Sequence, residues 1–275
     1  MKALNQRLNF IGLSLLLGAV LPFSSLISLI IPQNLYVTRA VLISFSKNLL
    51  AFIIFSGVFK APLKSLKFDR REINLLDLAL LTVFAFVLCV SCNIVPNIVS
   101  HIVGIKTNSS YVFNPLDYLA VALFPAVIEE LAFRQIITGG LSEYGTRFAV
   151  LVSALLFALS HTELTAVLYA FFCGIILACL YIRTCSIYAC IIVHFLCNAL
   201  TITCSIFENP NLCYKLAVML SLALSLVLFV ALRLKGIRIL PQETQKSSVS
   251  LFKAFFTNAI IIILLVINVI MIVCL

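Results

Sequence analysis

The sequence predicts an all-α polytopic membrane protein with about nine transmembrane helices, and three observations lead to this prediction. Hydrophobic residues make up 63% of the 275 residues and charged residues only 11%, whereas about a quarter of a soluble domain is charged. Apolar runs long enough to cross a bilayer follow one another along the chain. Basic residues gather in the loops between these runs. This composition excludes a soluble enzyme, a disordered chain and a nucleic-acid-binding protein.

Each expected helix is an apolar run of spanning or nearly spanning length. A helix rises about 1.5 Å per residue, so about 20 residues cross the hydrocarbon core. The weakest run is 147–161, which is short and leads almost directly into the next run. The nine runs are 9–31, 40–59, 75–98, 118–140, 147–161, 163–182, 186–207, 213–232 and 254–275.

The basic residues of the loops predict the orientation. With the N-terminus inside, fourteen Lys and Arg residues fall in inner loops and three, Arg39, Lys106 and Lys215, fall in outer loops. We therefore expect a cytoplasmic N-terminus, an outer C-terminus and a location in the plasma membrane. The net charge of +9 fits contact of the inner loops with anionic lipid headgroups. The loop 233–253 is the one expected hinge, before an appended last helix.

The ten cysteines lie mostly inside apolar runs, where a thiol behaves as a small hydrophobic group. Cys89 and Cys92 have C-x-x-C spacing, but they lie in the middle of an apolar run with no strand pattern around them. This context does not favour a redox or metal-binding role.

Ionisable and amide side chains inside the runs are the candidates for function, because burying them in a membrane is costly. Glu130 and Arg134 lie at i and i+4 and share a helix face, while Glu129 points about 100° away. We expect Arg134 to keep Glu130 ionised, which leaves Glu129 to accept a proton from water. The full set is Glu129, Glu130, Arg134, His161, His194 and Asn198, with Lys47 as a further charge inside a run.

Spacing predicts how these residues meet. His194 and Asn198 are one turn apart, as are Phe157 and His161. Pro125 precedes Glu129 by four residues; its missing N–H frees a backbone carbonyl one turn back and can bend the helix.

Three motifs in this order resemble the CPBP family, the CAAX proteases and bacteriocin-processing enzymes also called the ABI group. The motifs are Glu129-Glu130-x-x-x-Arg134, Phe157-x-x-x-His161 and His194-x-x-x-Asn198. The resemblance covers residues 118–207, between N-terminal helices in 1–117 and C-terminal helices in 208–275, all within one membrane domain. It implies a membrane-buried proteolytic cavity in which Glu129 and His161 activate a water. It also implies that His194 and Asn198 stabilise the oxyanion, with Glu130 and Arg134 supporting them.

The residues do not decide whether the protein uses a metal cofactor. Two imidazoles and a carboxylate, from His161, His194 and Glu129, could hold Zn²⁺ with a fourth position free, although no H-E-x-x-H motif is present. A water activated by glutamate alone needs no metal.

Alternative functions are kept beside the protease. The expected substrate is a membrane-associated or prenylated peptide, such as a bacteriocin precursor. A non-catalytic immunity or scaffold protein could keep the same motifs, with the carboxylates and imidazoles serving helix packing. A transporter would show paired hydropathy repeats, which this sequence lacks.

Overall fold

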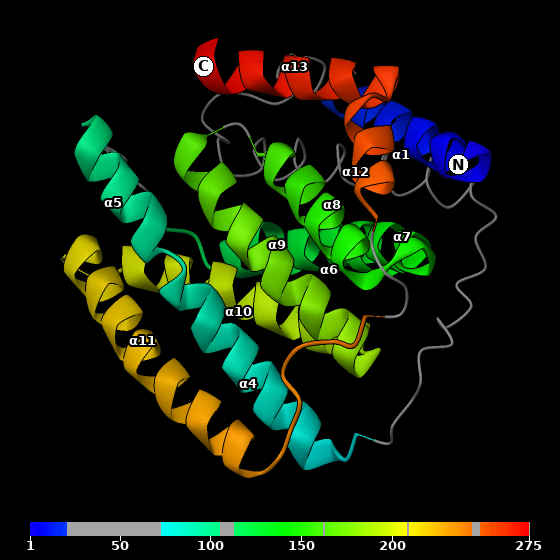
Figure 1. Cartoon of the computed structure of the whole chain (residues 1–275). Helices are drawn as coiled ribbons and strands as arrows, with labels where there is room; N and C mark the ends of the chain where they lie inside the picture. The colour runs from blue at the N-terminus through cyan, green and yellow to red at the C-terminus, as the bar shows by residue number, and fades with distance from the viewer. Residues whose placement is uncertain (21–72, 105–112, 162, 208, 244–247, 275) are drawn as a thin grey trace.

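The computed structural model describes residues 1–20, 73–104, 113–161, 163–207, 209–243 and 248–274, and these parts of the chain are helices joined by short connections (Figure 1). The prediction of an all-α membrane protein is confirmed for them. Four helical stretches are long and apolar enough to cross a membrane, as expected of an integral, multi-pass protein. They are Leu75–Val103, Leu164–Thr184, Ile187–Ser205 and Pro210–Leu234.

The number of spans stays a prediction. The run 40–59, with Lys47, lies outside the described residues, and 9–31 is described only as far as α1 (Lys2–Val20). The run 147–161 forms α8 (Thr146–Leu159), whose 14 residues are fewer than the roughly 20 that a span requires. The run 254–275 does not form one straight helix.

This last run is broken because Asn258 starts a new helix. α12 (Val249–Phe256) and α13 (Ala259–Cys274) meet at 65°, so they count as a fifth span only if taken together. The Asn258 side-chain oxygen accepts hydrogen bonds from the N–H groups of Ile260 and Ile261, each at 3.1 Å. Its amide donates to Asn9 of α1 at 2.6 Å, which fixes α13 beside the N-terminal helix.

One hydrophobic cluster joins four helices: α4 (Leu75–Ser91), α9 (Leu164–Thr184), α10 (Ile187–Ser205) and α11 (Pro210–Leu234). Polar caps define where three of them begin. Asn74, Ser186 and Asn209 each accept a backbone N–H of the first turn of α4, α10 and α11. After α4 the helix is interrupted, and α5 (Ile94–Val103) begins after Asn93.

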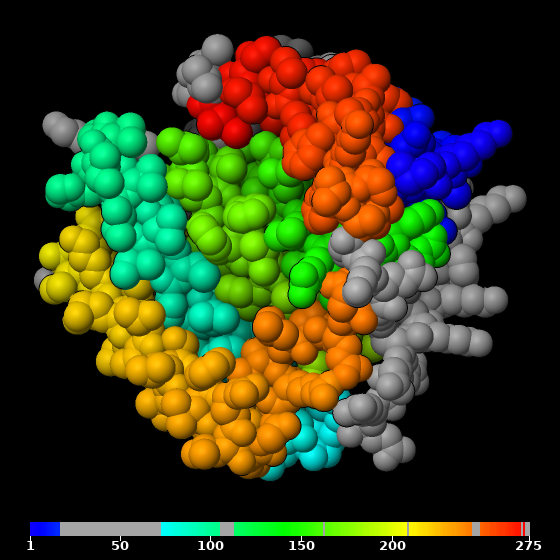
Figure 2. Space-filling model, in the orientation of Figure 1, coloured from blue at the N-terminus to red at the C-terminus, as the bar shows by residue number. Residues whose placement is uncertain are grey.

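A second cluster joins α1, α8, α12 and α13 to the helical stretch that contains Glu130. Figure 2 shows α12 and α13 lying over α8 and meeting α1. Leu4 and Leu8 of α1 and Phe255 of α12 are fully buried in this cluster. The N- and C-terminal parts of the chain therefore pack together against α8 and the helical stretch that contains Glu130.

α8 packs very closely on α9 at Gly174. A Cβ on Gly174 would lie 2.9 Å from the Cα of Ala154, so only glycine allows this approach without movement of the backbone. Because α8 ends at Leu159, His161 lies in the short connection to α9.

Four of the segments predicted to lie inside, among the described residues, are in contact with one another. Three contacts hold them together: Arg7 with Glu143 at 2.8 Å, Arg147 with Glu243 at 3.3 Å, and the Arg183 guanidinium with the carbonyl of Arg238 at 2.8 Å. This clustering agrees with the predicted sidedness of these loops. Which end faces the cytoplasm stays a prediction.

Candidate active site

The two glutamates lie in a helical stretch whose geometry changes twice. It consists of η2, a π-helix (Tyr118–Leu123), α6 (Phe124–Glu130) and η3, a second π-helix (Leu131–Thr138). It ends in α7 (Gly139–Leu141) and η4, a 3₁₀ turn (Ser142–Tyr144). π-helical turns are rare and often occur at functional sites.

Pro125 accounts for one contact of this stretch. In an α-helix the carbonyl of Val121 would accept the N–H of residue 125, which proline lacks. The Asn198 amide of α10 lies 3.5 Å from this carbonyl and donates to it, at the long end of the hydrogen-bond range. The predicted freed carbonyl is thus contacted by a residue of the third motif.

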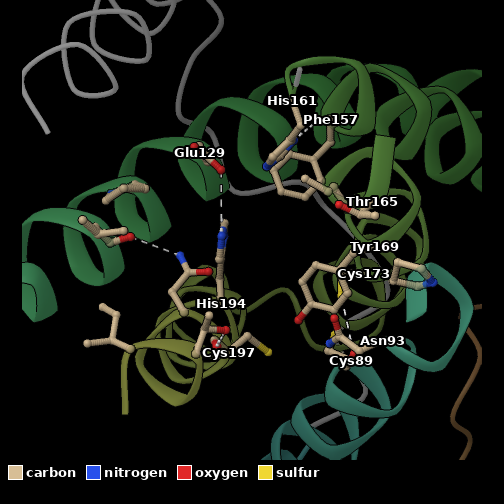
Figure 3. A pocket seen from close by; sticks show the side chains of 18 of the residues that line it. Cys89, Asn93, Glu129, Phe157, His161, Thr165, Tyr169, Cys173, His194 and Cys197 are labelled. Carbon is tan, nitrogen blue, oxygen red and sulfur yellow. Dashed lines mark hydrogen bonds and ion pairs between the residues drawn. The ribbon is translucent and has the colours of Figure 1, made fainter. Parts of the chain in front are cut away.

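A cavity of about 630 Å³ contains four of the six predicted site residues (Figure 3). Glu129, His161, His194 and Asn198 line it, and they come from α6, the α8–α9 connection and α10. Glu130 and Arg134 lie behind the wall, where both side chains are fully buried. The structure therefore places Glu129 and Glu130 on different faces of their helix, as predicted.

His194 lies between the two glutamates. Its Nδ1 donates to Oε1 of Glu130 at 2.9 Å. Its Nε2 lies 3.8 Å from Oε2 of Glu129 (Figure 3). The other oxygen of Glu130 lies 3.0 Å from Nε of Arg134, which confirms the predicted i, i+4 ion pair. A chain of charged contacts thus runs from buried Arg134 to Glu129 at the cavity surface.

With both carboxylates ionised, charge balance favours a doubly protonated His194. Glu129 and Glu130 contribute two negative charges, and Arg134 contributes one positive charge. An imidazolium at His194 makes the group neutral, and neutrality is strongly favoured where water is scarce. Its Nε2–H then points toward Glu129 and the cavity.

Phe157 organises the same wall. The Arg134 guanidinium carbon lies 4.5 Å from the centre of the Phe157 ring, a cation–π contact that shields the ion pair. The ring also meets the rings of His161 and His194 edge-to-face, at 5.2 and 5.8 Å between centroids. Nδ1 of His161 lies 3.1 Å from the Phe157 carbonyl, and donation to that oxygen leaves Nε2 as the basic nitrogen of His161.

The described residues do not fit a zinc site. Within the described ranges no three His, Cys, Asp or Glu side chains are placed to hold a metal ion, including the predicted set of Glu129, His161 and His194. His194 already uses one ring nitrogen on Glu130 and directs the other at Glu129. No step of the chemistry proposed below passes through a metal.

Sequence reasoning missed the uncharged polar lining of the cavity. One face of α5 and its N-cap carries Asn93, Asn97 and Ser100 at helical spacing. One face of α9 carries Thr165, Tyr169 and Cys173 in the same way. Single hydroxyl, amide and thiol groups are common in apolar runs, so only this i, i+4 spacing could have revealed them. Cys89 lines the cavity and Cys92 does not, and both thiols are free, so the C-x-x-C pattern forms no disulfide.

Comparison with protein families supports the resemblance. Residues 111–200 match the family model "Type II CAAX prenyl endopeptidase Rce1-like". The matched stretch contains all six predicted site residues, and the match confirms the similarity to the CPBP family of CAAX proteases. The Rce1-like family is a protease family, so the match supports a peptidase. No curated protein and no solved structure matches the chain.

Proposed function

We propose that this chain is an intramembrane endopeptidase that hydrolyses a peptide bond in a membrane-associated peptide or a prenylated C-terminus. One observation supports this most: Oε2 of Glu129 and Nε2 of His194 are 3.8 Å apart at the surface of one cavity. A water with hydrogen bonds of about 2.8 Å can reach both atoms at once. The same two groups can each bind one of the two oxygens of a tetrahedral intermediate.

Glu129 is the proposed general base. Its carboxylate takes a proton from the attacking water, which adds to the carbonyl carbon of the scissile bond. Arg134 and Glu130 are paired with each other, so Glu129 alone among the two carboxylates faces the cavity. His161 lines the same cavity and supports the water through its basic Nε2.

His194 and Asn198 are the proposed oxyanion site. As an imidazolium held by Glu130, His194 offers an Nε2–H to the developing negative charge. The Asn198 amide, one turn further along α10, offers a second donor. Glu130 is then a positioning residue, because it fixes the ring of His194 without touching substrate.

The cavity suits a substrate with uncharged side chains. Its described lining carries ionisable acid and imidazole groups only at Glu129, His161 and His194, and no Lys or Arg. The rest of the wall is apolar, aromatic, thiol, hydroxyl or amide. The cytoplasmic N-terminus is proposed because basic segments predicted to lie inside contact one another among the described residues. The location in the plasma membrane is kept as a prediction.

A cleavage experiment tests the proposal. The purified full chain, reconstituted in liposomes, is offered a library of membrane peptides that includes farnesylated C-terminal peptides. New peptide termini that appear with wild type and not with Glu129→Gln support an endopeptidase. Binding without cleavage would instead support a scaffold protein. If the protein neither cleaves nor binds any peptide, the transporter is the remaining alternative. Metal analysis of the active protein, with and without a chelator, distinguishes glutamate-based from metal-dependent hydrolysis.

A further inference from the structure

Two cysteines outside the proposed active site have their sulfur atoms in direct contact. Sγ of Cys204, near the end of α10, lies 3.2 Å from Sγ of Cys213, in the first turn of α11. Both are free thiols. They are nine positions apart, on either side of the short connection between the two helices.

We propose that Cys204 and Cys213 form a dithiol–disulfide pair that covalently joins α10 to α11. A disulfide requires an S–S distance of about 2.05 Å, which the two thiols can reach from 3.2 Å by small side-chain rotations. The two helices already pack against each other. This inference is independent of the proposed proteolysis.

The pair is accessible to a reagent through Cys213. Cys204 is 3% exposed, whereas Cys213 is partly exposed. The Cys213 thiolate therefore attacks a low-molecular-weight disulfide such as oxidised glutathione, forming a mixed disulfide and releasing one glutathione thiolate. The Cys204 thiolate then attacks the Cys213 sulfur, closing the bond and releasing the second glutathione. Two protein thiols are oxidised, one small disulfide is reduced, and the two thiol protons pass to the released thiolates.

The bond would fix the part of the cavity wall that α10 and α11 form. Tyr214 follows Cys213 directly, and Thr201 lies one turn before Cys204; both line the cavity. α10 also carries Asn198 at the cavity surface. A closed disulfide would hold this wall at a fixed distance from α11, whereas the dithiol form leaves the two helices joined only by their connection and packing.

The test uses the full chain in detergent, incubated with oxidised or reduced glutathione. The protein is then denatured in the presence of an alkylating reagent, so that every remaining thiol is blocked, and a glutamyl endopeptidase cuts after Glu208, between the two cysteines. After oxidation we expect the fragments with Cys204 and Cys213 to stay joined until a reductant is added, and neither thiol to carry the alkyl group. After incubation with reduced glutathione both should be alkylated.

Variants complete the experiment. Cys213→Ser should leave Cys204 unable to form the bond, so the fragments separate without reductant. Cys179→Ser, which removes another partly exposed thiol on α9, should leave the bond intact. The wild-type measurement needs no variant and so holds even if one fails to fold. Alkylation of both cysteines in the oxidised wild type, or a bond from either one to a different cysteine, would overturn the proposal.

Discussion

The contact between Glu130 and His194 makes a prediction that separates a structural from a positioning role. Glu130 is fully buried, with Arg134 at 3.0 Å on one oxygen and His194 at 2.9 Å on the other. Glu130→Gln keeps the shape but removes the charge, which leaves the fully buried Arg134 guanidinium without its counter-ion. Breaking one side of a buried ion pair costs about 3–5 kcal/mol.

This cost should be visible as reduced thermal stability. For a chain of this size each kcal/mol lowers the midpoint of unfolding by about 2–4 °C, so Glu130→Gln should lose on the order of 10 °C. Arg134→Met in the same chain removes the unpaired charge, and its side chain can pack on the Phe157 ring. Since an uncharged pair replaces a buried ion pair at little net cost, the double variant should regain most of the lost stability.

Activity should not return with stability. The double variant has no carboxylate to hold His194 as an imidazolium, so its rate of cleavage of a quenched fluorescent membrane peptide should stay at least about 100-fold below wild type. Glu163→Gln, an exposed carboxylate at the start of α9, is the matched control and should behave as wild type. A double variant that regains both stability and wild-type activity would show that Glu130 only supports the fold.

Two further substitutions test the packing around the site. Gly174→Val should lower the unfolding midpoint in detergent by several degrees, because its Cβ would lie 2.9 Å from the Ala154 backbone. Gly140→Ala is the control and should not lower the midpoint, because its Cβ meets no atom within 4 Å. Equal midpoints for the two variants would contradict this packing. Phe157→Leu removes the ring over Arg134 and should lower both the free energy of unfolding, by about 1–3 kcal/mol, and the cleavage rate. Wild-type values for both quantities would show that the ring is dispensable.

The local part of the site could be predicted from the sequence. The ion pair of Glu130 with Arg134 follows from helical spacing, as does the different direction of Glu129, and both are confirmed. That Pro125 frees a backbone carbonyl one turn back stays a prediction, and the Asn198 amide contacts the Val121 carbonyl at that position. The predicted features depend only on residues within one or two turns of each other, where helix geometry fixes the relative positions.

Contacts between helices could not be predicted in the same way. The hydrogen bond from His194 to Glu130, rather than to Glu129, depends on how α10 packs against α6, and no spacing within either helix specifies it. The π-helices on either side of α6 have no sequence signal beyond Pro125.

The break in the last predicted span has a signal in the sequence, at Asn258. Asn258 lies among apolar residues, and hydropathy averaged over a long window conceals it. Asparagine strongly favours the N-cap position, and here it ends one helical direction and starts another. α8 similarly stops short of a full span because Ser160 and His161 end the helix beside the cavity.

The most direct measurement of the central claim is the cleavage rate of Glu129→Gln, His194→Gln and the variant with both changes, each purified and compared with wild type. If the carboxylate and the imidazole act on the same reacting group, each single change should lower the rate by at least about 1,000-fold. The double variant should then be little slower than either single variant, because residues that act as a unit are not additive. A single variant that retains a tenth or more of the wild-type rate would contradict the claim.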